Sequence, residues 1–234
     1  ITQEKHFLEM ATNIATEISK SIDNKLFNFE AGLLYGLAGV VVFFDQLASV
    51  TKKEAYQSVA IDLMNTILAN NLVEDKKRKF VSLDDHLTPY LDCGSTGIIL
   101  VLLEIGRHCR SFLKGDVLNT LSELIDSCDV SITGHGSLFN GYSGFLLLDS
   151  ALKTCDKVQK IDSSAIQGLN LYLAGYHKNE ILCSDFYGFC CSMSLSEGAG
   201  GALLSLLRCQ FSMHRNNLYG ISCRQLSEDV DQTL

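Results

Sequence analysis

The pattern of apolar and polar positions along the chain predicts two kinds of helix that alternate. Residues 2–21 place apolar side chains at helical spacing on one side and charged ones on the other, as in an amphipathic surface helix. The segment 33–44 is apolar on nearly every face, so a helix there must be covered on all sides. The same alternation returns with amphipathic segments at 54–72, 114–128 and 162–177 and apolar runs at 98–103, 145–148 and 202–207. We therefore expect inner apolar helices surrounded by outer amphipathic ones, with each outer helix paired with the inner helix that follows it.

A short glycine motif begins each apolar run. The motif Gly-x-x-Gly has its first glycine at Gly36, Gly94, Gly141 and Gly198. This regular return predicts a helical repeat protein that forms a single domain over residues 1–234. Glycine allows the backbone a positive φ and lets neighbouring helices approach closely. Because every inner helix follows the same kind of turn, we expect the four glycine-rich turns on one rim, where unpaired helix N–H groups carry partial positive charge.

The segments between these helices predict long loops. Residues 71–89 are polar and charged and contain the only proline, while 131–140 and 181–195 also lack helical periodicity. We expect each loop to deliver side chains to the rim. Residues 211–234 have weak periodicity and an acidic end, which predicts one short helix at most.

Composition narrows the class of protein. A chain of 234 residues that is 47% hydrophobic, with one proline and no tryptophan, favours an ordered helical fold. The net charge of −8 and a pI near 5.2 disfavour binding to nucleic acid or to an anionic membrane surface. The apolar runs are too short to span a bilayer. Nine cysteines without a Cys-x-x-Cys pair are typical of free thiols packed in a cytoplasmic protein. The first residues carry neither methionine nor a secretion signal, and we expect a piece of a longer protein.

The glycine-rich segments carry a specific resemblance. They read Pro-Tyr-Leu-Asp-Cys-Gly-Ser-Thr-Gly-Ile at 89–98, Gly-Ser-Leu-Phe-Asn-Gly-Tyr-Ser-Gly at 136–144 and Leu-Ser-Glu-Gly-Ala-Gly-Gly at 195–201. In these motifs the chain resembles the lanthionine synthetase C-like family, the cyclases that close thioether rings in lanthipeptides. The resemblance implies an all-α fold, an α/α toroid of inner and outer helix pairs. The family toroid has seven pairs, and this chain would supply the last four.

The chain is most similar to the cyclase region of class III synthetases. In that class a lyase and a kinase domain precede the cyclase in one polypeptide. The partners that the resemblance implies are therefore these upstream domains and a dehydrated precursor peptide. The activity it implies is the Michael-type addition of peptide cysteine thiols to dehydrated Ser or Thr residues.

The zinc ligands of standard family members are missing from the matching turns. Those members take ligands from a Trp-Cys-x-Gly and a Cys-His-Gly turn, and a histidine from a Gly-x-x-His-Gly turn. Here Tyr35 stands in the histidine slot, Asp92 in the first ligand slot with Cys93 one place late, and Phe139 and Asn140 in the Cys-His slots. Such a set cannot complete a tetrahedral zinc site. We expect no zinc and no other cofactor, as in class III.

Three residues are the catalytic candidates. His135 lies between two glycines and is the best-placed general acid or base, although a loop histidine can be simply solvated. Tyr35 could protonate an enolate, with packing as the alternative role. Asp92 could act in the same chemistry or cap the following helix.

Four more residues are candidates for contact with the peptide. They are Cys93, Asn140, Tyr142 and Glu197. The alternatives are a packed thiol for Cys93, turn formation for Asn140 and a favourable position at the helix dipole for Glu197.

The sequence leaves three classes of function open. The first is a zinc-free cyclase that works by orienting thiol and alkene together. The second is a non-catalytic scaffold that holds the precursor for the lyase and kinase domains. The third, an α/α-toroid glycosidase, is disfavoured because the chain has no tryptophan and only isolated carboxylates at the predicted rim.

Overall fold

The computed structural model describes residues 5–23, 30–75, 78–83, 86–130, 133–153, 155, 183–185, 188–190 and 192–211. This part of the chain is mostly helical, in agreement with the all-α prediction at that coarse level. Its helices are α1 (Lys5–Asp23), α2 (Leu37–Thr51), α3 (Glu54–Asn70), α4 (Ser95–His108), α5 (Asp116–Ser127), α6 (Tyr142–Lys153) and α8 (Ala199–Phe211). None of these helices combines the length and the hydropathy that a membrane span requires.

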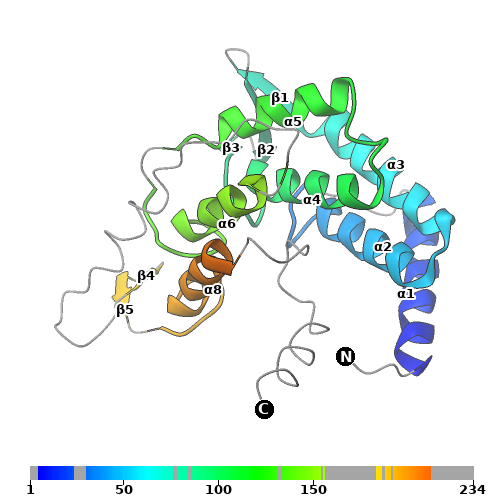
Figure 1. Cartoon of the computed structure of the whole chain (residues 1–234), viewed down its shortest axis with the longest axis horizontal. Coiled ribbons are helices and arrows are strands. Elements are labelled where there is room, and N and C mark those ends of the chain that lie inside the picture. Colours follow the sequence, from blue (N-terminus) through cyan, green and yellow to red (C-terminus); the bar gives the residue numbers. More distant parts are fainter. Residues whose placement is uncertain are drawn as a thin grey trace.

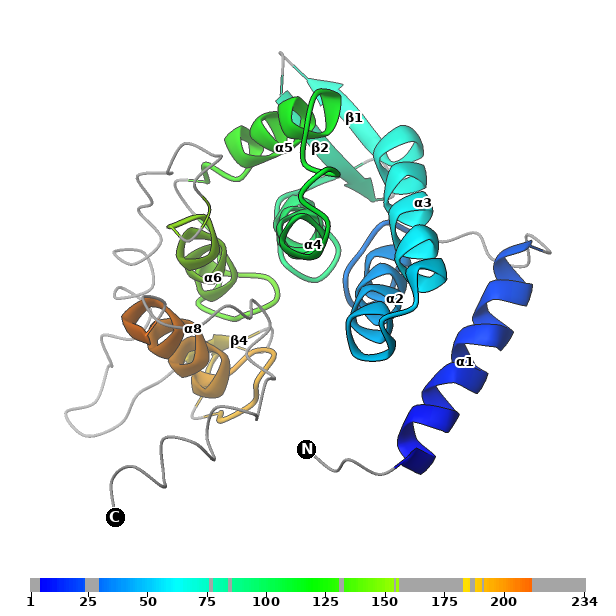
Figure 2. The same cartoon turned by 45° about the vertical axis from the view of Figure 1, so that its right-hand side comes forward.

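Four helices form a curved row. Helices α2, α4, α6 and α8 follow one another along an arc in Figure 2, and each contacts the next. Helices α3 and α5 lie on the convex side of the row, and α1 lies beyond its α2 end (Figures 1 and 2). The inner and outer arrangement expected from the alternating pattern is therefore present for the helices at 54–70 and 116–127. The expected helix at 162–177 lies outside the described residues, as does the segment 212–234.

The packing unit is an inner helix followed by an outer one. Helix α3 packs on α2, and α5 packs on α4, whereas α1 makes few contacts with the inner helix that follows it. The predicted pairing of each outer helix with the next inner helix is therefore wrong for these elements. Short connections explain the observed order, because a turn of a few residues returns the chain antiparallel to the helix it has just left.

The core runs along the middle of the row. Every residue of α4 from Ser95 to Gly106 is buried, and so is every residue of α6 from Tyr142 to Leu152. These are the runs that the sequence shows as apolar on all faces, and they are covered on all faces. At the ends of the row, Leu203 and Leu207 of α8 and Phe7 of α1 remain exposed.

Two of the three expected long loops contain strands instead. In the first of these segments, strands β1 (Leu72–Asp75), β2 (Arg78–Leu83) and β3 (His86–Thr88) form an antiparallel meander. The register pairs Leu72 with Val81 and Val81 with Thr88. Strands β4 (Cys183–Asp185) and β5 (Gly188–Cys190) form a second antiparallel pair within 181–195. The third segment carries neither helix nor strand in its described residues, 133–140.

The meander is held against the helices by side chains. Val81 is buried, and its backbone N–H donates to Ser95 Oγ at the start of α4 (3.2 Å). Lys79 Nζ lies 2.9 Å from Glu123 Oε2 and donates to Thr120 Oγ1 (3.1 Å), both on α5. The sheet therefore fills the space between α5 and the beginning of α4.

Candidate functional site

The four glycine-rich turns lie side by side at the same end of the inner helices. We call the surface formed by residues 30–39, 88–97, 135–144 and 192–201 the rim. Backbone hydrogen bonds join each turn to the next: Leu34 N–H donates to Asp92 O (3.0 Å), Leu91 N–H to Phe139 O (3.0 Å) and Leu138 N–H to Ser196 O (3.1 Å). The predicted gathering of the four turns on one rim is thus confirmed.

Each turn has the longer pattern Leu-x-x-Gly-x-x-Gly. The second glycine of one turn lies against the leucine of the turn before it, so that a Cβ atom at Gly97 would lie 3.1 Å from Leu33 Cβ. The same contact would be 3.2 Å between Gly144 and Leu91. The expected close approach at these glycines is therefore confirmed, and it explains why the position excludes larger residues.

The backbone conformation of the first glycines differs from the prediction. Gly36 has φ −141° and Gly94 has φ −116°, which are extended values open to any residue. Among the described glycines only Gly115, outside the motif, has a positive φ. The first glycine is needed for space instead, since a Cβ atom at Gly36 would meet the Glu30 carbonyl oxygen.

The backbone N–H groups at the helix starts are largely paired. They donate to carbonyl oxygens of the same turn, from Leu37 to Glu30 (2.8 Å), Ala38 to Ala31 (3.2 Å), Thr96 to Pro89 (3.1 Å), Tyr142 to His135 (3.1 Å) and Ala199 to Ser192 (2.8 Å). The expectation of unpaired N–H groups on the rim is therefore wrong at these positions. Because these donors are occupied, they do not offer the free N–H cluster with which helix starts bind phosphate and other anions.

Four candidate residues occupy one equivalent position. Tyr35, Cys93, Asn140 and Glu197 each stand immediately before the first glycine of a turn. Tyr35 is 79% exposed and Glu197 is exposed, while Cys93 and Asn140 are partly exposed. The packing role for Tyr35 is not supported, because its ring faces solvent. The rim thus presents a phenol, a thiol, an amide and a carboxylate in neighbouring turns.

Asp92 and Cys93 interact with each other. Asp92 Oδ1 accepts a hydrogen bond from the Cys93 backbone N–H (2.7 Å), and no side chain caps α4 at Gly94. The helix-capping role for Asp92 is therefore wrong. Burial, with the hydrogen bond to Asp92 as the second cause, raises the pKa of the Cys93 thiol to about 12. Cys93 is consequently a neutral thiol at physiological pH.

His135 is the candidate with an unsatisfied atom. Its side chain is partly exposed, but Nδ1 is buried without a hydrogen-bond partner. A buried polar atom without a partner costs free energy unless water or a ligand satisfies it. The loop that carries the imidazole is fixed, because the His135 carbonyl accepts the Tyr142 N–H and the Gly136 carbonyl accepts the Ser143 hydroxyl.

Tyr142 is placed in the core, not on the rim surface. Its side chain is 4% exposed, and the Thr133 backbone N–H donates to its hydroxyl (3.3 Å). In this position the ring supports the loop of His135 and does not face a peptide on the surface.

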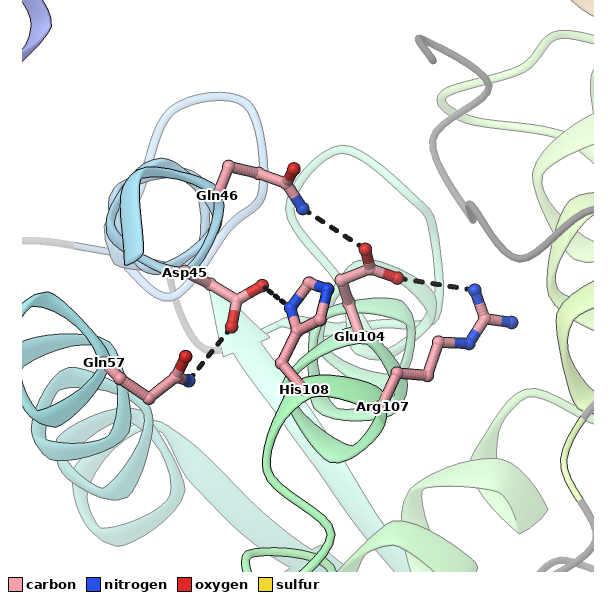
Figure 3. A network of polar contacts seen from close by, with 6 residues as sticks. All are labelled: Asp45, Gln46, Gln57, Glu104, Arg107 and His108. Carbon is pink, nitrogen blue, oxygen red and sulfur yellow. Dashed lines mark hydrogen bonds and ion pairs between the residues drawn. The ribbon is translucent and has the colours of Figure 1, made fainter. Parts of the chain in front are cut away.

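A second group of chemically active side chains lies away from the rim. Asp45 of α2 and Glu104 and His108 of α4 converge in the contact between these helices (Figure 3). All three lie in the later half of their helices, whereas the rim is formed at the helix starts. These residues lie outside the repeated glycine motif and its spacing. An acidic residue inside an otherwise apolar helix was the available signal.

The geometry of this acid–histidine cluster is well defined. His108 Nδ1 lies 2.7 Å from Asp45 Oδ2, and this hydrogen bond is the main cause that raises the pKa of His108. Burial raises the pKa of Glu104. Gln57 donates to Asp45 Oδ1 (3.0 Å) and Gln46 donates to Glu104 Oε1 (3.2 Å).

Comparison with models of known protein families found no match to this chain, and comparison with curated proteins found none either. The residues on the rim and in the acid–histidine cluster are the features of the chain that bear on its function. Of the two, the rim is the surface formed by the repeated motif itself, and it holds the exposed candidates.

Proposed function

We propose that this chain is part of an α/α toroid of the lanthionine synthetase C-like type and acts as a zinc-free cyclase on a dehydrated precursor peptide. The curved row of α2, α4, α6 and α8, with α3 and α5 on its convex side, supports a toroid segment (Figure 2). The resemblance in the rim motifs supports the chemistry. The free thiols of Cys93, Cys109, Cys128, Cys155 and Cys209 suit a cytoplasmic enzyme that works beside its lyase and kinase domains.

The reaction requires one proton to move. The cysteine sulfur forms a bond to the β-carbon of the dehydrated residue, the carbon–carbon π bond breaks, and the α-carbon takes up a proton. The thiol loses its proton as its sulfur attacks. A single group can accept the proton from the thiol and return it to the enolate. This group must stand on the rim, within reach of a bound peptide.

His135 fits this role, and the partly exposed position of its side chain on the rim is the observation that carries the proposal. The imidazole lies in a loop fixed to α6, so its position is set before the peptide binds. Tyr35, exposed on the first turn of the rim and two turns away from His135, is the second proton donor that the surface offers. Asn140 and Glu197 supply polar groups that can orient the peptide backbone.

The state of Cys93 is compatible with such a substrate. An ionised thiol on the rim would itself add to a dehydrated residue and trap the peptide. With a pKa of about 12, the Cys93 thiol remains protonated and is a poor nucleophile. The rim can therefore hold an electrophilic peptide without reacting with it.

A scaffold function is the second candidate. Leu34, Met193 and Leu195 are exposed on or beside the rim, together with Tyr35. Such apolar side chains can hold an extended peptide without any chemistry. In that case the domain would present the precursor to the lyase and kinase, and ring closure would be spontaneous.

A cyclisation assay tests the proposal. The probe is a synthetic peptide with one cysteine and one dehydroalanine, incubated with the protein in a chelating buffer and followed by thiol consumption and mass spectrometry. We expect the wild-type protein to accelerate ring closure and His135→Ala to reduce the rate by about 100-fold or more. Tyr35→Phe tests the second donor. His86→Ala, an exposed histidine on β3, is the matched control.

The outcomes separate the two candidates. Equal rates with and without protein would refute catalysis, and peptide binding measured by fluorescence anisotropy would then favour the scaffold. Acceleration that survives His135→Ala would refute the role of His135 as the acid-base group.

A further inference from the structure

The acid–histidine cluster of Asp45, Glu104 and His108 takes no part in the proposed reaction. Each residue offers one ligand atom, and these atoms all lie within 4.8 Å of one another. In Figure 3 the imidazole of His108 lies between the two carboxylates. Two helices thus direct two oxygen ligands and one nitrogen ligand to a common point.

The sequence explains why the three side chains meet. Glu104 and His108 are four residues apart on α4, so they share one face of that helix. Helix α2 packs on that face and contributes Asp45. The Asp45 and Glu104 side chains are 1% and 4% exposed, respectively. Buried carboxylates are costly unless they are paired or bind a metal ion.

The carboxylates also have supporting hydrogen bonds. Gln57 Nε2 holds Asp45 Oδ1 and Gln46 Nε2 holds Glu104 Oε1, while Arg107 Nη1 lies 3.4 Å from Glu104 Oε2. Metal sites use such outer partners to fix the orientation of ligating carboxylates. The His108 side chain is 32% exposed, so the cluster is open to solvent on one side. A cation can enter from this side and keep water in its remaining positions.

We propose that Asp45, Glu104 and His108 bind a divalent transition-metal cation, with zinc as the best fit, which links α2 to α4. One imidazole and two carboxylates suit zinc, and they provide too few oxygens for calcium. The positive charge of Arg107 offsets part of the negative charge of the two carboxylates. The cluster therefore disfavours cations that bind through electrostatic attraction alone. The site lies apart from the rim and does not depend on the proposed cyclase function.

Binding requires only small movements of the side chains. Ligand bonds of about 2.0–2.1 Å in a tetrahedral site place ligand atoms about 3.3 Å apart. His108 Nδ1 and Asp45 Oδ2 must therefore separate slightly from 2.7 Å, and Glu104 must approach. The cation replaces the proton that these two atoms share, and that proton leaves to solvent.

Metal titration of the chelator-treated protein tests the site. We expect one equivalent of Zn²⁺ by calorimetry and by elemental analysis after dialysis. His108→Ala and Glu104→Gln should each weaken binding by at least about 100-fold, since each removes a direct ligand. The matched controls are His86→Ala, an exposed histidine on β3, and Cys93→Ser on the rim, and both should bind as the wild type does.

Cobalt provides a second measurement. Co²⁺ at this site should give visible bands without the sulfur-to-cobalt charge-transfer band of a cysteine ligand. Circular dichroism confirms that each variant is folded, and His108→Ala, at a partly exposed position, decides the question if a carboxylate variant unfolds. Absence of Zn²⁺ binding, binding unchanged in His108→Ala, or a cysteine charge-transfer band would overturn the proposal.

Discussion

The contact between neighbouring turns of the rim can be tested with a single methyl group. In Gly144→Ala the added Cβ would lie 2.5 Å from the Leu138 carbonyl oxygen and 3.2 Å from Leu91 Cβ. The first atom belongs to the same turn and the second to the neighbouring turn, and hydrogen bonds join the two turns. The backbone must shift to admit the methyl group.

The expected loss of stability is moderate but measurable. Overpacking of a rigid contact costs about 3 kcal/mol at the upper end of its usual range. Replacement of glycine by alanine in a helix returns up to about 1 kcal/mol. The net loss is therefore about 2 kcal/mol, which corresponds to a fall in Tm of roughly 4–8 °C for a chain of this size.

Urea unfolding followed by circular dichroism measures this loss. Gly134→Ala is the control, because nothing lies within 4 Å of the Cβ position there. It should change stability by less than about 0.5 kcal/mol. If Gly144→Ala proves as stable as the wild type, or if both variants lose equal stability, the close packing of the turns is wrong.

Three further predictions concern the core, a rim thiol and the acid–histidine cluster. Leu102→Ala, at a fully buried position of α4, should lower the free energy of unfolding by about 3 kcal/mol, and an unchanged urea midpoint would contradict that placement. Native Cys93 should be alkylated by iodoacetamide roughly a thousandfold more slowly than a thiol of pKa 9.0, and rapid labelling in the folded protein would refute its raised pKa. The hydrogen bond to Asp45 raises the pKa of His108 in the folded protein above its value of about 6.5 in the unfolded chain. The protonated His108 therefore stabilises the fold fully below about pH 6.5, and this stabilisation is lost as the pH rises through the pKa of the folded state. Thermal melts in EDTA should therefore show that Tm of the wild type falls as the pH rises above about 6.5, and that this fall is smaller in His108→Gln. Identical slopes of Tm against pH for both proteins would contradict the ion pair with Asp45.

The helices could be predicted because their signal is local. A run such as 98–103 is apolar on all faces, and the structure buries every residue of α4 from Ser95 to Gly106. The strands at 72–88 were missed because proline and clustered charge favoured a loop. Their stability depends on pairing between Val81 and its partners on both sides and on contact with α5. Such partners across a sheet leave little mark in the local pattern.

The position of the rim followed from the repeated motif, but the orientation of its side chains did not. Tyr142 stands between the first glycine of its turn and the apolar run at 145–148, so the motif does not show whether its ring lies on the rim surface or in the core. The acid–histidine cluster was harder still, because Asp45 and His108 lie 63 positions apart and meet only when α2 packs on α4. Buried acidic residues in apolar helices are the feature that would reveal such a cluster in a related sequence.

The two ends of the inner helices differ in a way that bears on any metal found in this protein. The rim turns hold Asp92, Phe139 and Asn140 in the slots where zinc cyclases of the lanthionine synthetase C-like type have ligands. The only His, Asp and Glu group suited to a cation among the described residues lies toward the other ends of α2 and α4. Zinc bound by Asp45, Glu104 and His108 would hold these helices together without contact with a peptide on the rim. Its removal should therefore lower stability and leave the rate per folded molecule unchanged, whereas zinc at the rim would change that rate directly.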